Sequence, residues 1–289
     1  MKRLSYRRPK NKSAPICRLL RPRAGKEKMM KFYVLDTGYL DGEKDSVVHD
    51  TSREPDKSLL PMPVLAFLIE HPDGLILYDT GSNPKAMEGY WSKTMQRKFA
   101  LHQTPQQRLE AQLALIGVRP EEIGRVILSH LHLDHTGGLP LFPHADVYVP
   151  KADYVNALLT IHSSSDPEQH GGYIWGDLTA PLKKVHLIEE DGEFLPGIEI
   201  VNLPGHTPGL LGLILHCQNG VYLLPQDAAY VSANYERPPI LPRSPYDRAL
   251  YAASIEKLHQ LQEEYGATII FPHDIGQFAS LRKAPEFYE

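Results

Sequence analysis

The stretch Ser129–Gly138 reads Ser-His-Leu-His-Leu-Asp-His-Thr-Gly-Gly and places three imidazoles and one carboxylate within six residues. His130 and His132 lie two positions apart, so both rings point to one side if the segment leaves a strand in an extended conformation. Asp134 and His135 follow, and the two glycines after them let the backbone turn freely, so these ligands approach from another direction. Imidazole and carboxylate groups bind zinc and similar divalent ions. The stretch therefore predicts a metal site rather than a polar loop whose histidines cap neighbouring elements.

Further ligands are expected later in the chain, because one loop cannot surround an ion. Three residues of the right type stand where an apolar run stops: His206 after Ile198–Leu203, Asp227 after Val221–Leu224, and His273 after Thr268–Phe271. Strands that end at one edge of a sheet would present such side chains together. We therefore predict a site built from five imidazoles and two carboxylates.

The pattern His-x-His-x-Asp-His, followed by His, Asp and His at strand ends, resembles the metallo-β-lactamase superfamily. Within it, the chain is similar to the N-acyl-homoserine lactone lactonases, the quorum-quenching hydrolases, over roughly residues 30 to 289. The likeness includes Tyr78-Asp79-Thr80-Gly81, Gly205-His206-Thr207-Pro208-Gly209, Asp227-Ala228-Ala229-Tyr230 and His273-Asp274-Ile275. The resemblance implies an α/β fold, the four-layer αβ/βα sandwich of the metallo-β-lactamase fold. Assignment to the lactonases depends mainly on Tyr230, three residues after Asp227.

Two divalent metal ions per chain are expected, because seven ligands exceed what one tetrahedral zinc needs. Carried over from the family, His130, His132 and His206 hold one ion, Asp134, His135 and His273 hold the other, and Asp227 bridges them. Zinc is the expected metal, with iron, cobalt and manganese as alternatives. The resemblance also makes Asp79 a carboxylate that orients ligating rings, against the alternative of a turn-forming residue.

The resemblance implies a hydrolase acting on a carboxylic ester, an N-acyl-homoserine lactonase. A hydroxide bridging the two ions would attack the lactone carbonyl, because bound metal lowers the pKa of water toward ~7. Tyr230 would donate a hydrogen bond to the carbonyl oxygen, and Asp134 would help move a proton to the leaving alkoxide. The alternatives are other binuclear hydrolases, such as a glyoxalase II type thioesterase or a broad-specificity lactonase and esterase. A metal-stabilised binding protein is disfavoured, because structural zinc sites usually rely on Cys.

The composition fits one catalytic domain at residues 30–289. A chain of 289 residues that is 42% hydrophobic can bury a large core. Its net charge of -4 gives no reason to expect nucleic acid or an anionic membrane as a partner, and no apolar run approaches the ~20 residues of a membrane span. Two cysteines, Cys17 and Cys217, exclude a disulfide framework and fit a reducing cytoplasm, where we expect the protein. The expected partner is a small lactone substrate.

Residues 1–29 are predicted to form a basic, flexible extension. Residues 1–28 carry eleven Lys and Arg against the single acid Glu27, with few large apolar residues. Such a segment cannot bury enough surface to fold alone, and an upstream start before Met29-Met30 is a further interpretation. A targeting role or an arm that embraces a second copy is the alternative, so a homodimer stays open.

The first half of this domain reads as strands and helices. Strands are predicted at 32–35, 64–70, 75–78, 126–128 and 146–149, with a polar loop from 36 to 58. Thr104–Gln107 is a capping box with Pro105 at the first helical position, and the helix it starts ends at Gly117. Residues 151–160 form the next predicted helix. Residues 82–103 fit an acyl-chain groove, ordinary core or a dimer contact equally well.

The second half repeats this order. Residues 162–180 are irregular and rich in polar and aromatic residues, which predicts a lid over the metal cleft. Strands follow over 185–224, with Asn219-Gly220 as a hairpin turn. Ser244-Pro245-Tyr246-Asp247 is predicted to start a helix that ends at Gly266, and its apolar stripe is predicted to be Leu250, Ser254, Leu258, Leu261 and Tyr265. Two similar halves are what the resemblance to an αβ/βα sandwich implies.

Overall fold

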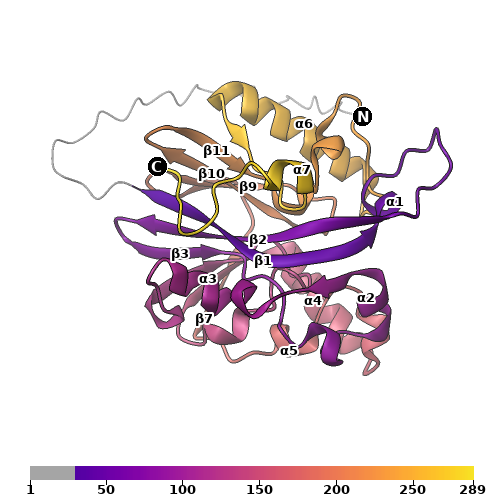
Figure 1. The fold of residues 1–289 in the computed structure, drawn as a ribbon, viewed down its shortest axis with the longest axis horizontal. Coiled ribbons are helices and arrows are strands. Elements are labelled where there is room, and N and C mark those ends of the chain that lie inside the picture. The colour runs from indigo at the N-terminus through magenta and orange to yellow at the C-terminus, as the bar shows by residue number, and fades with distance from the viewer. Residues whose placement is uncertain (1–29) are drawn as a thin grey trace, which may run out of the picture.

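The computed structural model describes residues 30–289, which form two β-sheets with helices on their outer faces (Figure 1). The predicted extension at residues 1–29 lies outside the described residues. The strands are β1 (Lys31–Glu43), β2 (Leu59–His71), β3 (Gly74–Tyr78), β4 (Ala100–His102), β5 (Ile123–Ile127), β6 (Asp146–Pro150), β7 (Lys184–Ile188), β8 (Gly192–Leu195), β9 (Ile198–Asn202), β10 (Leu211–Cys217), β11 (Gly220–Leu224) and β12 (Thr268–Ile269). The helices are α1 (Lys44–Val47), α2 (Lys93–Lys98), α3 (Leu109–Leu115), α4 (Lys151–Ser163), α5 (Trp175–Leu178), α6 (Arg248–Tyr265) and α7 (Ile275–Phe278).

Strand direction brings several strand ends to the same place. The first sheet has the order β4-β1-β2-β3-β5-β6-β7 and the second the order β12-β11-β10-β9-β8. In the first sheet β3, β5, β6 and β7 run parallel. β7 pairs with β6 and is part of this first sheet, although in the sequence it is the first strand of the second run. In the second sheet β12 runs parallel to β11. β9 points the same way as β11, because both pair antiparallel with β10.

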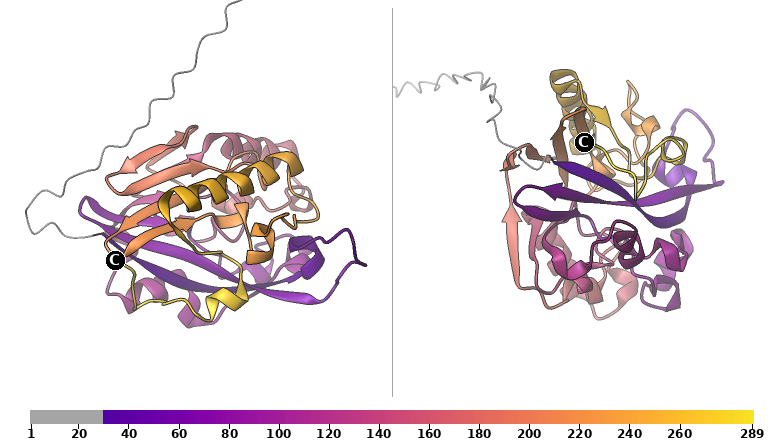
Figure 2. Two further views of the ribbon diagram at one scale, coloured as in Figure 1. Left: turned by 90° about the horizontal axis from the view of Figure 1, so that it is seen from above. Right: turned by 60° about the vertical axis from the view of Figure 1, so that its left-hand side comes forward.

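The core is layered, and β2 shows why. Its Phe67 packs in the cluster between the two sheets, whereas the next residue, Leu68, packs with Leu113 of α3. Successive strand residues face opposite sides, so a strand that is apolar at every position is covered on both faces. On the far side, Leu223 of β11 packs against Leu258 of α6, which lies over the five-stranded sheet (Figure 2). The predicted four-layer αβ/βα sandwich is confirmed.

β1 is longer than predicted, so the expected polar loop at 36–58 is wrong in its first part. Polar side chains inside this strand have partners that the local sequence does not reveal. Thr37 Oγ1 donates to the carbonyl oxygen of Val64 at 2.8 Å, and both carboxylate oxygens of Asp36 accept from Gln107 Nε2 at 3.1 Å. A bulge at this point lets the strand continue after the polar residues.

The helix predicted from Pro105 to Gly117 is broken in two. The capping box forms, with the Thr104 N–H donating to Gln107 Oε1 at 3.0 Å, but it caps only a 3-10 turn. Arg108 is extended, and α3 begins at the next residue.

The apolar stripe predicted for α6 is also partly wrong. The helix is capped by Asp247 and ends at Gly266, as expected, but Leu250 is 41% exposed and Tyr251 is buried. A Cβ at Gly205 would lie 2.2 Å from the backbone nitrogen of Tyr251. This close approach of two backbones turns Tyr251 inward and leaves Leu250 outside. Within residues 30–289, no helix has both the length and the apolar character needed to cross a bilayer.

Candidate metal centre

The seven predicted ligands meet where strands of both sheets end. The loop that carries His130, His132, Asp134 and His135 leaves β5, whereas His206 follows β9, Asp227 follows β11 and His273 follows β12. Ligand-type atoms of these residues lie within 4.8 Å of one another in three overlapping groups. Residues separated by more than 140 positions in the sequence therefore share one cluster.

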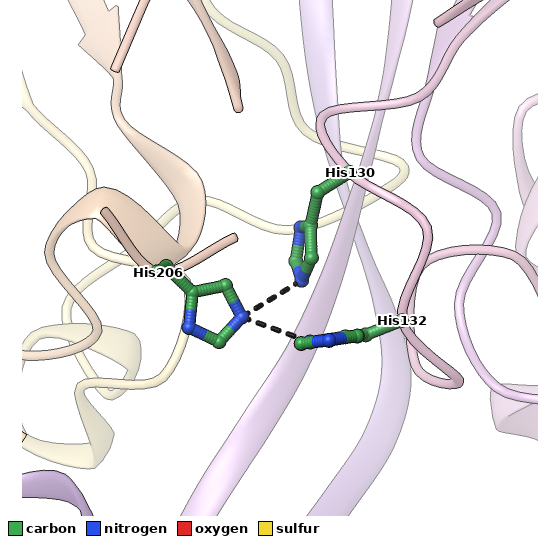
Figure 3. Close-up of side chains that lie close together, drawn as sticks. All are labelled: His130, His132 and His206. Carbon is green, nitrogen blue, oxygen red and sulfur yellow. Dashed lines mark hydrogen bonds between the residues drawn. The ribbon is translucent and has the colours of Figure 1, made fainter. Parts of the chain in front are cut away.

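His130, His132 and His206 form the first group, and Figure 3 shows their three rings converging from two separate segments. Nε2 of His206 lies 3.1 Å from Nε2 of His130 and 2.9 Å from Nδ1 of His132. Two ligands of a tetrahedral zinc, each about 2.1 Å from the ion, are separated by about 3.4 Å. The spacing of the ring nitrogens is close to this value.

Asp134, His135 and His273 form the second group. Nε2 of His135 is buried without a hydrogen-bond partner among residues 30–289. It lies 3.5 Å from Oδ2 of Asp134, which is long for a hydrogen bond but suitable for two ligands of one ion. An unpartnered buried nitrogen surrounded by ligand atoms is suited to binding a cation, so these residues fit a metal ion.

The two carboxylate oxygens of Asp227 face different groups. Oδ2 lies 3.3 Å from Nε2 of His206 and 3.7 Å from Nε2 of His130. Oδ1 lies 3.0 Å from Nε2 of His273 and 3.4 Å from Nε2 of His135. The arrangement therefore suits two ions with one carboxylate between them.

The electrostatics differ between the two groups. Burial lowers the pKa of each imidazole in the first group, that of His132 to about 3, so these rings are neutral and can bind a cation. Burial also acts to lower the pKa of His135 and His273, but nearby carboxylates, Asp227 among them, outweigh it and raise both values. Buried carboxylates require positive charge nearby, which a divalent ion in the second group would supply.

One side chain and one backbone carbonyl hold the rings of the second group in place. Oδ2 of Asp79 lies 2.8 Å from Nδ1 of His135, and Oδ1 accepts from the Ser129 N–H at 2.7 Å. Nδ1 of His273 lies 2.7 Å from the carbonyl oxygen of Pro63. Since Nδ1 is bonded in both rings, Nε2 faces the cluster. Asp79 therefore has the orienting position that the resemblance implied.

Gly137 and Gly138 were predicted to let the backbone turn freely, but the structure gives a different reason for glycine here. Gly138 has φ -91, an ordinary right-handed value, and Gly137 is not among the glycines with positive φ. A Cβ at Gly137 would lie 1.9 Å from the backbone nitrogen of Asn83. Glycine is needed because two backbones touch, and free turning of the chain is not the reason.

One side of the cluster is less buried than the rest. His132 and His206 are partly exposed, whereas the other five ligand-type residues are buried. The hydroxyl of Tyr230 lies at this side, 2.7 Å from Nδ1 of His206. His170, which stands beside two glycines, belongs to none of the three groups, and its Nε2 lies 2.8 Å from the carbonyl oxygen of Ser164.

Two buried carboxylates near the loop were not predicted. Asp153 of α4 accepts from the Leu131 N–H at 2.8 Å and from the Tyr173 hydroxyl at 2.6 Å, and the Tyr173 ring lies 5.0 Å from that of His132. Asp177 accepts from the Thr136 hydroxyl at 2.9 Å. Residues 162–180 thus contact the site, although their role as a lid stays a prediction.

Residues 82–103, for which three interpretations were open, contribute core. Trp91 and Met95 are buried in one apolar cluster with Leu133 of the loop. Tyr90 donates its hydroxyl proton to Asp177 at 2.6 Å. These contacts favour ordinary core for the buried residues of this segment.

Known proteins are similar to this chain in sequence and in fold. The model of the metallo-beta-lactamase superfamily matches residues 59–273. N-acyl homoserine lactonase AiiB of Agrobacterium fabrum is 30% identical over 276 residues, covering 90% of this chain and 99% of that protein. N-acyl homoserine lactonase AiiA of Bacillus thuringiensis subsp. kurstaki is 31% identical over 261 residues, covering 89% and 98%. A solved N-acyl homoserine lactone hydrolase, with the product N-hexanoyl-L-homoserine at its catalytic metal centre, matches with a TM-score of 0.78 and 28% identity over 90% of this chain and 99% of that one. This chain therefore belongs to the metallo-beta-lactamase superfamily and, within it, to the N-acyl homoserine lactonases.

Proposed function

We propose that this chain is a metal-dependent hydrolase that opens the lactone ring of N-acyl homoserine lactones, the reaction of quorum quenching. The observation that carries this proposal is the less buried side of the cluster. There the Tyr230 hydroxyl lies 2.7 Å from Nδ1 of the partly exposed His206, so a substrate carbonyl bound beside this ring would be within its reach. The alignments with AiiB and AiiA cover nearly the full length of those two proteins, and both proteins are named for this hydrolysis.

The proposed ligands follow the two groups. His130, His132 and His206 would hold one ion, Asp134, His135 and His273 the other, and Asp227 would bridge them. Bound there, two divalent cations would supply a water that is nucleophilic at neutral pH and would polarise the substrate carbonyl. We propose zinc, because imidazole nitrogen and carboxylate oxygen are among its usual protein ligands; elemental analysis of purified protein would identify the metal.

Tyr230 is proposed to stabilise the developing negative charge on the substrate carbonyl oxygen. With Nε2 of His206 facing the cluster, Nδ1 carries the proton and donates to the Tyr230 oxygen. The phenol therefore keeps its own proton for the substrate. Burial raises the pKa of Tyr230 well above its ordinary value, so the hydroxyl remains a donor at neutral pH.

Asp134 is proposed to move a proton to the leaving alkoxide. Its carboxylate lies in the second group, with Oδ2 3.7 Å from Nε2 of His273. Only one of its two oxygens is needed as a metal ligand, so the other is available to carry a proton. The pKa of Asp134 is lowered, because His135 and other neighbours outweigh the effect of burial. The group is therefore ionised and able to accept a proton before passing it on.

We also propose that residues 30–289 form one catalytic domain, since both sheets contribute ligands and share an apolar layer. The paucity of cysteine supports a reducing cytoplasm as the compartment. A second copy of the chain as a partner stays a prediction, which sedimentation would test.

The test is turnover of hexanoyl and decanoyl homoserine lactones in a pH-indicator assay. We expect Tyr230→Phe and Asp227→Ala to lose activity, while Tyr265→Phe, whose hydroxyl contacts Glu199, retains it. Unchanged rates in both site variants would overturn the assignment. A panel of thioesters and β-lactams tests the alternatives, and faster turnover of a thioester would favour the glyoxalase II type activity.

A further inference from the structure

Gln226, which immediately precedes Asp227, has an unusual backbone in a fully buried position. Within residues 30–289, only Asp79 (φ 59) and Gln226 (φ 46) adopt positive φ without being glycine. This conformation is unfavourable for residues with a Cβ, and it persists where the surrounding structure fixes it, frequently at functional sites. Both residues that adopt it here flank the proposed metal centre.

The two side chains are bonded to each other. Nε2 of Gln226 donates to Oδ2 of Asp79, and this same oxygen lies 2.8 Å from Nδ1 of His135. The Ser129 hydroxyl donates to it as well, at 2.8 Å. Gln226 thus joins the segment that carries Asp227, after β11 of the second sheet, to the carboxylate that orients His135, after β5 of the first sheet.

Stability alone does not account for Gln226. Its Oε1 is buried and has no hydrogen-bond partner within the described part of the chain, and a buried acceptor without a partner is unfavourable. Glycine would relieve the backbone at this position, and an apolar side chain would avoid the unpartnered oxygen. A residue that carries both disadvantages, and whose side-chain amide donates to Asp79, is explained by that bond.

We propose that Gln226 is a positioning residue for the second group of ligands. By donating to Asp79 Oδ2, the amide fixes the carboxylate in the orientation that accepts the Nδ1–H of His135, so that Nε2 of His135 points toward the metal position between Asp134 and Asp227. Gln226 itself is not a ligand and does not touch the substrate. The inference rests on the proposed two-ion site and does not depend on the identity of the lactone.

The test compares Gln226→Gly and Gln226→Leu with the wild type. Each metal-free protein is titrated with zinc, and ¹⁵N-histidine NMR monitors binding at the individual imidazoles. Glycine accepts the backbone conformation and removes the whole side chain, so the relief of the backbone offsets part of the cost of the cavity and this variant is expected to fold when metal-free. Leucine keeps the size of the side chain and serves if the glycine variant fails to fold. The matched control is Gln107→Ala, which removes a Gln–Asp hydrogen bond of the same type at Asp36.

We expect zinc binding at His135 and His273 to weaken about 10- to 100-fold in both Gln226 variants, the range typical of groups that orient a ligand. Binding at the first group should stay unchanged, as should both affinities in Gln107→Ala. Wild-type affinity for both ions in the variants, or equal weakening at both groups, would overturn the positioning role. A wild-type protein that binds fewer than two ions would instead overturn the proposed two-ion site, so the two failures are distinguishable.

Discussion

The hydroxyl of Tyr230 lies 2.7 Å from Nδ1 of His206, across the imidazole ring from the nitrogen that faces His130 and His132. The backbone carbonyl oxygen of Tyr230 accepts a hydrogen bond from the N–H of His273 at 3.0 Å. Tyr230 is therefore fixed through its side chain to the first group and through its backbone to the second. A phenol held at both ends loses little freedom when a substrate binds, which favours a role in catalysis.

Tyr230→Phe is expected to lower kcat for lactone opening by about 100-fold or more, since loss of one oxyanion donor costs about 3 kcal/mol in the barrier. KM should change much less, because the donor acts on charge that develops during the reaction. Steady-state kinetics on hexanoyl homoserine lactone measure the split. A variant with wild-type kcat would show that the hydroxyl serves only to hold His206.

Gly137→Ala is expected to destabilise the protein by about 3 kcal/mol, since a side chain forced against backbone distorts a packed interior. The added Cβ would lie 1.9 Å from the Asn83 nitrogen and 2.3 Å from the carbonyl carbon of Ser82, so the loop must move. Chemical denaturation of the metal-free protein measures the change. Gly124→Ala is the control, because a Cβ there meets nothing within 4 Å; equal stability of the two variants would contradict the proposed packing.

Asp177 is expected to make stability depend on pH. Burial raises its pKa to about 6, despite the hydroxyls of Tyr90 and Thr136 that donate to it. Between roughly pH 4 and pH 6 the folded protein therefore holds more protons than the unfolded chain, and the free energy of unfolding falls as pH rises, by about 3 kcal/mol in total. The contribution is complete below this window and lost above it.

Asp177→Asn should remove this dependence, because an amide is neutral at every pH and can still accept from Tyr90. Urea unfolding of both proteins at roughly pH 4 and pH 7 gives the gap between their stabilities. The gap should shift in favour of the variant by about 3 kcal/mol on going to the higher pH. Because this gap is a difference between two proteins at the same pH, any destabilisation that both suffer from losing metal at low pH cancels. A gap that does not move would place the carboxyl pKa near its ordinary value.

The meeting of the proposed ligands could be predicted from the sequence, because each of the three later ones marks the end of an apolar run. His206, Asp227 and His273 follow strands that point the same way, so recognising the strands was enough to bring the ligands to one edge. The motif from His130 to His135 added the other four proposed ligands in one contiguous stretch. Local patterns thus contained most of the metal centre.

The contacts that hold the proposed ligands could not be predicted in this way, although the family resemblance implied the role of Asp79. Gln226 and Asp79 are 147 positions apart. The sequence around Gln226, which follows an apolar run and Pro225, does not indicate that the two residues meet. Asp153 stands in an ordinary amphipathic helix, and only the fold brings it to the Leu131 N–H. The polar part of β1 was missed for the same reason, because Asp36 and Thr37 are satisfied by partners distant in the sequence.

This chain is proposed to need two cations in one cluster to open a lactone. The most direct measurement is titration of the metal-free protein with zinc while hydrolysis of hexanoyl homoserine lactone is followed. We expect activity to be absent at the start and to reach its maximum at two equivalents per chain. Full activity without metal, or a maximum at one equivalent with no gain from the second, would contradict the account.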